Sequence, residues 1–343
     1  MTTLVVQTSF LGDVVLTTPL IAELAKRSQV DVLTTLPGAQ VLANNPAIRN
    51  TLVYEKRGGD KGISGFVRMA KRLRNPGRIS ELSNGGYDAA YLAQGSLRSA
   101  MLAVAAGVRQ RIGFETSAGR AFYTQRVRYN AERHHAERLW QLSMSDCADP
   151  PRPEQVQPHL YPGDEERRAV DRLLSNHGLS NPFVALAPGS AWGTKRWPFF
   201  PELAALLQDR FPVVVIGGNG DVATGETIVS QLPPGRSLNA AGKLSFLGSA
   251  EMIGRAAALV ANDSAAQHLA SAMGTTTITV YGPTVPEFGF GPLAPGSGVA
   301  GVTGLACRPC HKHGPARCPL GHWRCMRELS SHQVHQILTN TIP

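Results

Sequence analysis

The segment from Leu259 to Pro283 constrains the fold more than any other part of the chain, because it has the pattern of a complete strand–helix–strand unit. Apolar residues lead to Asp263 and Ser264, whose side-chain oxygens favour a helix start. Small residues then run to Gly274, a natural helix end, and the β-branched residues of Thr275–Tyr281 are typical of a buried parallel strand. Since a helix start beside such a strand attracts anions, the segment predicts either a ligand-binding βαβ unit or a purely structural one.

The same alternation of strands and helices runs through the rest of the chain in two halves. In the first half we expect strands at Leu4–Gln7, Val30–Thr34, Thr51–Tyr54, Tyr87–Leu92 and Arg109–Phe114, and helices at Val14–Arg27, Ala39–Asn44, Gly65–Leu73, Leu97–Ala105 and His135–Cys147. In the second half we expect further strands at Phe183–Ala187 and Val213–Gly217, and helices at Asp164–His177, Phe199–Arg210, Val222–Leu232, Phe246–Ala257 and Ser330–Ile342. The Pro/Gly-rich segment 285–304 is expected to be loop.

This alternation predicts an α/β fold with two Rossmann-like, doubly wound domains that face a cleft. The boundary is indicated by Ala148–Pro162, which contains five prolines and reads as a stiff linker without helical periodicity. The expected domains are therefore residues 1–160 and 161–343.

The charge of the chain is unevenly distributed. The whole chain carries a formal +9, and the stretch from Lys56 to Arg128 has fourteen Lys/Arg against four Asp/Glu, a local +10. Such a stretch predicts either a solvated basic face or an anionic partner. We take Lys61, Arg68, Arg98 and Arg120 as candidate acceptor-binding residues. Few aromatic residues interrupt the stretch and no nucleic-acid motif is present, so a nucleic-acid partner is not expected.

The hydrophobic pattern favours a protein that is not embedded in a membrane. Hydrophobic residues make up 43% of the chain, and no apolar run approaches the length of about 18 residues that a membrane span needs. The N-terminal sequence MTTLVVQTSFLGD lacks a basic region and a small-residue cleavage site, so we expect no signal peptide and a cytoplasmic location.

Gly12 and Asp13 follow the first expected strand, at the start of the first helix. A carboxylate at that point can act as a general base on an incoming hydroxyl group. It can equally serve as a helix N-cap, and the two roles are compatible.

The loop that follows the first strand of the second half, APGSAWGTKRWP, combines glycines, hydroxyl groups and two cations. Ser190, Thr194, Lys195 and Arg196 are suited to binding phosphate, although the loop is not a Walker motif and could be an ordinary surface loop. Trp197 is expected to pack as a lid or an anchor. The later segment contributes three more candidate donor-binding residues, namely Asp263, Ser264 and His268.

Cys307, Cys310, Cys318 and Cys325 form a cysteine-rich tail. Their spacing could provide a closed four-ligand zinc site, but the second pair is six residues apart rather than two. Reduced thiols, or disulfides in an oxidising setting, are the alternatives. Cys147 stands apart and is expected to be a buried thiol.

Taken together, the motifs Leu11-Gly12-Asp13, GSAWGTKRWP, NDSAAQH and the following YGP resemble those of the ADP-heptose:lipopolysaccharide heptosyltransferases, glycosyltransferase family 9. The tail CRPCHKHGPARCPLGHWRCM is similar to that of the heptosyltransferase II branch. The resemblance extends from about Thr3 to Leu329.

The resemblance implies a GT-B fold in which the first domain mainly binds the acceptor and the second binds the nucleotide-sugar. It implies an inverting, metal-independent transfer that requires no cofactor, with Asp13 as the catalytic base. Lys195 matches the lysine that contacts the donor diphosphate, and Thr194, Asp263 and Ser264 match positions near the sugar and phosphates. The implied partners are ADP-heptose and a phosphorylated lipid A–Kdo acceptor, which places the protein at the inner face of the inner membrane as a peripheral protein.

The sequence departs from the family pattern at two positions. Ala265 stands where the family usually has glycine, and the acidic residue that contacts the donor ribose has Asp221 as its nearest candidate. A different nucleotide-sugar donor, an epimerase on the same fold and a non-catalytic binder of anionic ligands are therefore the alternatives to heptosyl transfer.

Overall fold

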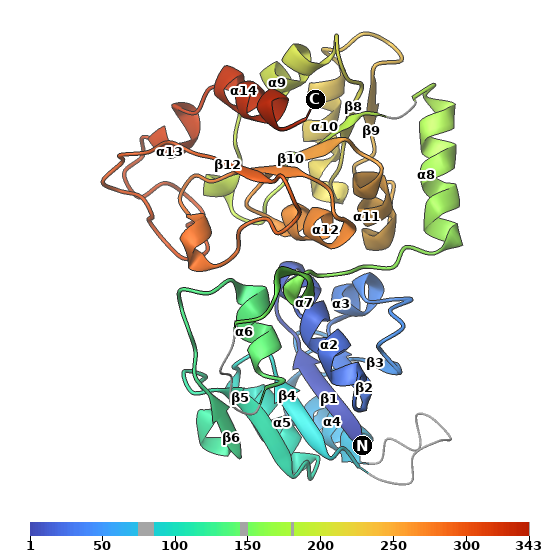
Figure 1. The fold of residues 1–343 in the computed structure, drawn as a ribbon, viewed down its shortest axis with the longest axis vertical. Coiled ribbons are helices and arrows are strands. Elements are labelled where there is room, and N and C mark those ends of the chain that lie inside the picture. The colour runs from blue at the N-terminus through green and yellow to red at the C-terminus, as the bar shows by residue number, and fades with distance from the viewer. Residues whose placement is uncertain (75–85, 145–149, 180–181, 343) are drawn as a thin grey trace. The chain divides into compact units, whose positions relative to one another are not determined.

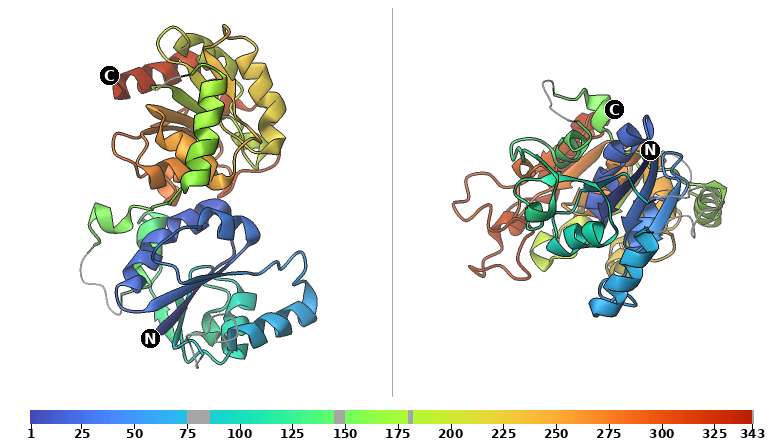
Figure 2. Two further views of the ribbon diagram at one scale, coloured as in Figure 1. Left: turned by 90° about the vertical axis from the view of Figure 1, so that its right-hand side faces the viewer. Right: turned by 90° about the horizontal axis from the view of Figure 1, so that it is seen from below.

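The computed structural model describes residues 1–74, 86–144, 150–179 and 182–342. The chain divides into two compact units, Met1–Pro158 and His159–Pro343. Each unit contains a six-stranded sheet in which every neighbouring pair of strands is parallel (Figure 1). Helices flank both sheets (Figure 2), as expected where parallel strands are joined by helical crossovers.

The sheet of the first unit has the order β3-β2-β1-β4-β5-β6. Its strands are β1 (Thr2–Gln7), β2 (Gln29–Thr34), β3 (Asn50–Val53), β4 (Ala89–Leu92), β5 (Gln110–Phe114) and β6 (Gln125–Val127). Its helices are α1 (Leu11–Leu16), α2 (Thr18–Ala25), α3 (Leu36–Val41), α4 (Gly62–Arg74), α5 (Leu97–Ala105), η2 (Arg120–Phe122), α6 (His135–Gln141) and α7 (Pro153–Val156).

The sheet of the second unit has the order β12-β11-β10-β7-β8-β9. Its strands are β7 (Val184–Ala187), β8 (Val213–Val215), β9 (Ser237–Asn239), β10 (Ala258–Asn262), β11 (Thr277–Val280) and β12 (Gly298–Ala300). Its helices are α8 (Asp164–Asn176), η3 (Gly193–Lys195), α9 (Phe200–Leu207), η4 (Asn219–Asp221), α10 (Val222–Val229), α11 (Phe246–Gly254), α12 (Ala265–Met273), η5 (Pro286–Phe288), α13 (Arg324–Arg327) and α14 (Ser331–Thr341).

The two sheets share one winding pattern. In each, the first strand of the unit pairs with the second on one side and with the fourth on the other, so that the strand order reverses beside it. Open α/β sheets bind ligands at the carboxyl ends of the strands at this switch point. The predicted class, α/β with two Rossmann-like doubly wound domains, is confirmed.

The central strands form because their residues can be buried on both faces. All four residues of β7 and all five of β10 are buried, as the apolar composition of these segments predicts. In the second unit, side chains such as Leu203 on α9 and Leu338 on α14 belong to the same apolar cluster as Val184 and Val260 from the sheet. In the first unit, Leu73 on α4 and Leu102 on α5 belong to the cluster around β1 and β4.

Several expected elements require correction. The single helix expected over 14–27 is two helices, because α1 ends at Leu16 and Pro19 occupies the first turn of α2, where its missing N–H is tolerated. The helix expected over 135–147 ends at Gln141, and positions 145–147, Cys147 included, lie outside the described residues.

The expected linker and loop also contain regular structure. Pro153 begins α7 inside the proline-rich segment, and Val156 on that helix is buried. The segment 285–304, expected to be loop, contains η5 and the edge strand β12. The short strands β6 and β9 had no counterpart in the sequence prediction.

Candidate functional site

Lys195 and Asp263 form an ion pair at the switch point of the second unit. Lys195 ends η3, in the loop after β7, and Asp263 directly follows β10. Lys195 Nζ lies 2.6 Å from Asp263 Oδ2, and the two side chains are 10% and 12% exposed. The structure thus brings together two residues that are far apart in sequence and that were both predicted to bind the donor.

The carboxylate of Asp263 accepts two further hydrogen bonds. Thr284 Oγ1 donates to Oδ2 at 2.7 Å, and Gln267 Nε2 donates to Oδ1 at 3.0 Å. The position of the carboxylate, and with it the position of the Lys195 ammonium group, is therefore fixed from several sides. A cation fixed in this way can stabilise an anionic ligand without first having to be ordered.

Asn262 connects the two loops that carry this pair. Its side-chain oxygen accepts from the backbone N–H of Trp197 at 3.1 Å, and its side-chain amide donates to the Pro188 carbonyl at 2.7 Å. The Trp197 side chain is 3% exposed, and its Nε1 donates to the Leu329 carbonyl at 2.9 Å. Trp197 is thus an anchor of the loop, and the alternative of a lid is excluded.

The remaining residues of the loop differ in their exposure. Thr194 is buried, and its hydroxyl donates to the Pro315 carbonyl at 2.5 Å. Ser190 is partly exposed, and its carbonyl accepts from Nε of the exposed Arg196 at 3.0 Å. Ser190 and Arg196 therefore occupy the side of the loop that solvent or a ligand can reach.

The start of α12 differs in one respect from the prediction. Ser264 is the N-cap residue, but its side chain makes no capping hydrogen bond. The helix ends at Gly274 as predicted, in the left-handed conformation with φ 72°. Ala265, which replaces the family glycine, is the first residue of the helix and is partly exposed. His268, in the second turn, is 5% exposed, and its ring packs edge-on to Phe290 with centroids 6.4 Å apart.

Asp221 lies against the same loop. Its carboxylate accepts from the Gly218 N–H at 2.9 Å. A Cβ atom placed on Gly189 would stand 2.5 Å from the carboxylate oxygens, so a larger residue there would displace the Asp221 side chain. The structure thus places Asp221, which sequence reasoning could assign only by proximity, beside the loop that carries Ser190.

Asp13 lies at the switch point of the first unit. It is the third residue of α1, whose N-cap is Phe10, so the expected N-cap role of Asp13 is wrong. Ser9 Oγ donates to Asp13 Oδ2 at 2.5 Å, and His135 Nε2 on α6 lies 3.8 Å from Oδ1. Burial, with a smaller contribution from the nearby Arg138 charge, lowers the pKa of His135 to about 3. The imidazole beside Asp13 is therefore neutral at neutral pH.

A second group of polar side chains at this edge was missed by the sequence analysis. The Thr8 hydroxyl donates to Gln94 Oε1, and Lys56 Nζ donates to the same oxygen at 3.2 Å. Burial, together with the charges of Arg98 and Arg57, lowers the pKa of Lys56. These three residues follow β1, β4 and β3, so their position after expected strands was the signal that could have identified them.

The predicted acceptor-binding residues fall into different surroundings. Arg98 donates to the Tyr54 hydroxyl at 2.7 Å and to the carbonyls of Asp60 and Gly62, and its guanidinium lies over the Tyr54 ring. Arg68 pairs with Asp60 at 3.0 Å. Arg98 and Arg68 therefore hold the loop before α4, and the exposed Lys61 lies in that loop.

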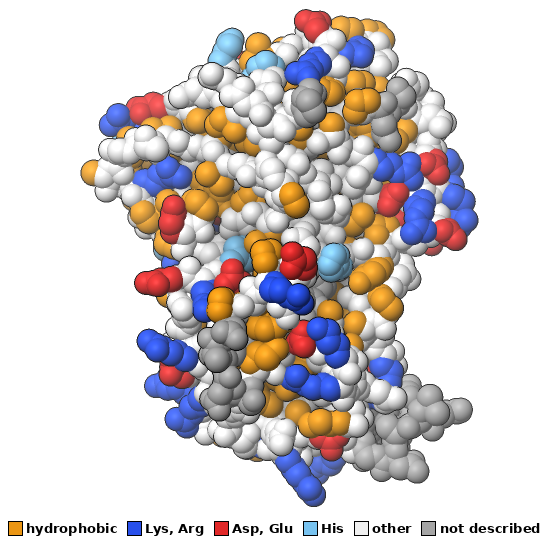
Figure 3. Space-filling view, viewed as in Figure 1, with side chains coloured by type: hydrophobic (Ala, Val, Ile, Leu, Met, Phe, Trp, Pro, Cys, Tyr) orange, Lys and Arg blue, Asp and Glu red, His pale blue; other side chains and the backbone are white. Residues whose placement is uncertain are grey.

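Gly12 and Arg120 lie elsewhere in the first unit. Gly12 is buried in α1, next to Asp13. Arg120 is exposed on η2. Figure 3 shows a group of Lys and Arg side chains (blue) at the lower left, where β5 and β6 lie in Figure 1. The structure thus brings Lys61, Arg68 and Arg98 together around one loop, and Arg120 lies on another element.

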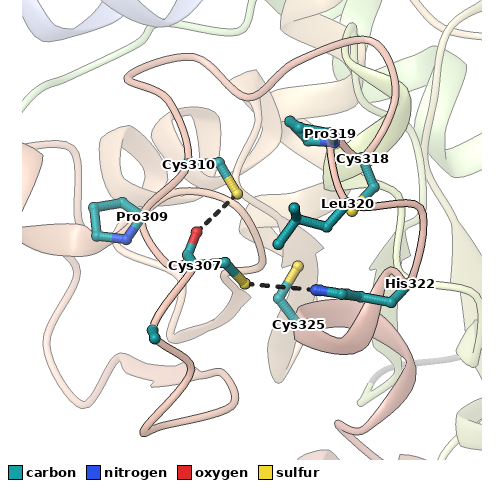
Figure 4. Close-up of a pocket in the computed structure, with 9 residues that line it drawn as sticks. Cys307, Pro309, Cys310, Cys318, Pro319, Leu320, His322 and Cys325 are labelled. Carbon is teal, nitrogen blue, oxygen red and sulfur yellow. Dashed lines mark hydrogen bonds between the residues drawn. The ribbon is translucent and has the colours of Figure 1, made fainter.

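The four cysteines of the tail are free thiols, and together with His322 they line one pocket (Figure 4). Burial, with the neighbouring cysteines, raises the pKa of Cys325 to about 11. Among the described residues, no three His, Cys, Asp or Glu side chains already stand at positions that could hold a metal ion. The four cysteines of the predicted zinc site are thus not paired in disulfides, and their side chains do not yet have the geometry of a metal site.

Two parallel doubly wound units are the architecture of the GT-B glycosyltransferases. The solved structure of ADP-heptose lipopolysaccharide heptosyltransferase II from Escherichia coli matches with a TM-score of 0.76 at 23% identity, over 99% of this chain and 98% of that one. Lipopolysaccharide heptosyltransferase 1 of Pseudomonas aeruginosa is 29% identical over 84% of this chain and 80% of its own length. Lipopolysaccharide heptosyltransferase 2 of E. coli is 26% identical over 83% and 84%.

The family model of glycosyltransferase family 9 (heptosyltransferase) matches residues 78–322, and the chain belongs to this family. It is a glycosyltransferase, as the resemblance implied. Both heptosyltransferase types occur among the relatives, so the comparison supports the family more firmly than it supports type II.

Proposed function

We propose that this protein transfers heptose from ADP-heptose to the lipid A–Kdo–heptose inner core of lipopolysaccharide. Membership of the heptosyltransferase family supports the sugar, and the names of the relatives support the lipopolysaccharide acceptor. The E. coli protein of similar fold is an ADP-heptose heptosyltransferase, which supports the donor. The observation that carries the proposal is the buried Lys195–Asp263 pair beside the start of α12, since it can bind a diphosphate.

We assign donor binding to the second unit. Lys195 would stabilise the negative charge that develops on the leaving ADP, with Thr194, Ser190 and Arg196 around it. Asp263 and Ser264 would lie near the sugar and phosphates, and Asp221 beside Gly189 is the candidate for the ribose. His268 stays a predicted donor-binding residue, one that would act through packing because its side chain is 5% exposed.

We assign the catalytic base to Asp13. The acceptor hydroxyl oxygen would attack the anomeric carbon of heptose while the bond from that carbon to the ADP oxygen breaks. The hydroxyl proton would pass to the Asp13 carboxylate, and a single displacement of this kind inverts the anomeric configuration. Ser9 orients the carboxylate, and the neutral His135 adds no positive charge beside it. No step in this scheme requires a metal ion at the reacting atoms.

We assign the phosphorylated acceptor to the first unit. Arg68 and Arg98 already make contacts within the protein, so the exposed Lys61 and the half-buried Lys56 are the cations better placed to meet a phosphate. Gly12 would let the acceptor approach the backbone beside Asp13, and Arg120 would contribute a more distant positive charge.

We further propose that the protein works in the cytoplasm as a peripheral protein at the inner face of the inner membrane. Helix α4 exposes Ile63 at 83% and Val67 at 42%, and its last turn carries the basic residues Lys71, Arg72 and Arg74. An amphipathic basic helix of this kind binds anionic lipid surfaces. Among the helices that the structure describes, none is long and apolar enough to cross a bilayer.

The experiment that tests the function compares donors and acceptors directly. ADP-heptose, a UDP-sugar and a GDP-sugar are each incubated with lipid A–Kdo that carries or lacks a first heptose, and products are identified by mass spectrometry. We expect that ADP-heptose is the only one of the three donors that is used. One heptose should be added to the acceptor that already carries a heptose. Transfer from a UDP- or GDP-sugar instead would replace the proposed donor, and turnover of donor without any acceptor would indicate an epimerase.

A further inference from the structure

The four cysteines of the tail converge within one short segment of the chain. Cys307, Cys310 and Cys318 lie in the connection between β12 and α13, and Cys325 lies on α13. Together they line one pocket of about 330 Å³ (Figure 4). The sulfur atoms of Cys307, Cys310 and Cys325 turn toward a common space in this view. Such convergence is the arrangement that a tetrahedral thiolate site requires.

His322 belongs to the same cluster. Its Nε2 lies 3.8 Å from Cys307 Sγ, across the pocket from Cys310. An imidazole at that distance can donate a weak hydrogen bond to a thiolate and so orient a metal ligand. His322 therefore reinforces the cluster whether or not it binds the ion itself.

The backbone after Cys318 turns tightly toward α13. Gly321 and Trp323 adopt left-handed conformations, with φ of 71° and 57°. The turn returns the chain to the pocket, so that Cys318, His322 and Cys325 all line it.

The charges nearby favour several thiolates in one place. Between Cys307 and Cys325 the chain contains Arg308, Lys312, Arg317 and Arg324, and it contains no Asp or Glu. One divalent cation with four thiolates carries a net charge of −2, which neighbouring cations offset.

The thiols do not yet stand at ligand positions. The Cys310 thiol donates to the Cys307 carbonyl, with Sγ 3.1 Å from the oxygen. Metal binding removes the thiol proton, so this hydrogen bond is lost and the side chain can rotate toward the pocket. The change needed is therefore in side-chain rotamers, within a backbone that already gathers the four residues.

We propose that Cys307, Cys310, Cys318 and Cys325 bind one Zn²⁺ ion. Four Zn–S bonds form, and the four thiol protons are released to solvent. The tail between Cys310 and Cys318 would then be clamped at both ends. Within that segment Pro315 accepts the hydrogen bond from Thr194, and a Cβ on Gly314 would lie 3.2 Å from Lys195 Cγ. The ion would thus hold the segment that packs against the proposed donor loop, and this last consequence rests on the proposed function.

The test measures metal content rather than activity. The full chain is purified under reducing conditions and its zinc is measured by mass spectrometry. It is then reloaded with Co²⁺, which gives intense sulfur-to-cobalt charge-transfer absorption when thiolates bind it tetrahedrally. We expect one ion per chain and that absorption for the wild type. A chain with four reactive thiols that binds neither ion, or a chain with two disulfides, would overturn the proposal.

Variants locate the site and separate it from misfolding. Cys307→Ser and Cys325→Ser should lose the ion, whereas Cys147→Ser, at the one cysteine outside the cluster, should keep it. His322→Ala should also keep the ion; its loss there would overturn the four-thiolate ligand set. Chelation of the wild type, which needs no variant to fold, should lower its melting temperature, and re-addition of Zn²⁺ should restore it. Since none of these readouts uses a sugar donor, they stand even if the proposed activity fails.

Discussion

The switch points of the two units have the same strand topology but carry different kinds of side chain. In the second unit, the loops after β7 and β10 bring together Lys195 and Asp263, a buried ion pair. In the first unit, the equivalent loops after β1 and β4 bring together Thr8 and Gln94, a pair of neutral side chains. The carboxylate of the first unit, Asp13, instead lies in the first turn of α1, beside the Ser9 hydroxyl and the neutral His135 imidazole.

This difference suggests how one fold can supply two functions. A buried cation held by a carboxylate is suited to binding and to stabilising a leaving anion, because its position is fixed before the ligand arrives. A carboxylate held by a cation is a weaker proton acceptor than one whose neighbours are neutral. The same sheet topology therefore provides a donor-binding site in the second unit and a general base in the first.

The largest expected effect is at Asp13. Asp13→Ala and Asp13→Asn should lower the rate of heptosyl transfer by about 10²- to 10⁴-fold, the usual contribution of a general base. The rate is measured in single turnover with saturating donor. Glu132→Ala, which removes an exposed carboxylate of the same unit, is the control and should change little. If the Asp13 variants transfer heptose at close to the wild-type rate, Asp13 is not the catalytic base.

The next effect is at Lys195. Lys195→Ala should lower the transfer rate by about 10²- to 10³-fold, because the charge on the leaving ADP loses its principal cation. Arg172→Ala, an exposed cation on α8, provides the control for a general loss of positive charge in the second unit. If the two variants lose the same amount, the effect is long-range and the ion pair has no special role.

A smaller effect should separate buried from exposed ion pairs. Asp263→Asn leaves a buried ammonium group without its counter-charge, and we expect the free energy of unfolding to fall by about 1–3 kcal/mol. Asp164→Asn breaks the exposed pair with Arg167 on α8 and should cost at most about 1 kcal/mol. Urea denaturation of the two variants measures both values. Equal costs would show that the Asp263 network does not order the donor loop.

The smallest effect concerns pH in the first unit. In the folded chain the pKa of His135 is lowered to about 3, whereas in the unfolded chain it has its ordinary value of about 6.5. Between these two pH values the imidazole is protonated in the unfolded chain and neutral in the folded chain. Stability conferred by the neutral imidazole is therefore full above about pH 6.5 and is lost as the pH falls from there toward 3. The loss is at most about 1.4 kcal/mol per pH unit.

His135→Gln provides the comparison for this pH effect. The free energy of unfolding of the variant should lack that part of the pH dependence as the pH falls from about 6.5 toward 3. If the unfolding free energies of the wild type and the variant change in parallel over this range, burial does not lower the pKa of His135.

Much of the fold follows from local pattern. The strand β7 is a continuous apolar run, β1 contains the apolar run Leu4–Val6, and α5 matches its expected bounds of Leu97–Ala105. The short edge strands β6, β9 and β12 were missed because three residues carry too little periodicity and depend on pairing with a neighbouring strand.

The candidate site was predictable in part. Lys195 and Asp263 were identified from loop chemistry, but their pairing was not, because a contact across 68 positions depends on strand order. Ser9 and His135 were missed for the same reason, since the fold and not the sequence brings α6 next to Asp13. Arg98 is the opposite case, a predicted ligand-binding residue that the fold uses within the protein. Its guanidinium donates to carbonyls of the loop before α4.

The central claim is that the second unit binds the donor and the first unit carries the general base. It is tested most directly by the dissociation constant of ADP-heptose, measured by calorimetry for the wild type, Asp13→Asn and Lys195→Ala. The account predicts a constant within about 2-fold of wild type for Asp13→Asn and one raised about 10-fold or more for Lys195→Ala, about 1.4 kcal/mol of binding free energy. A weakened donor in Asp13→Asn together with unchanged binding in Lys195→Ala would contradict it.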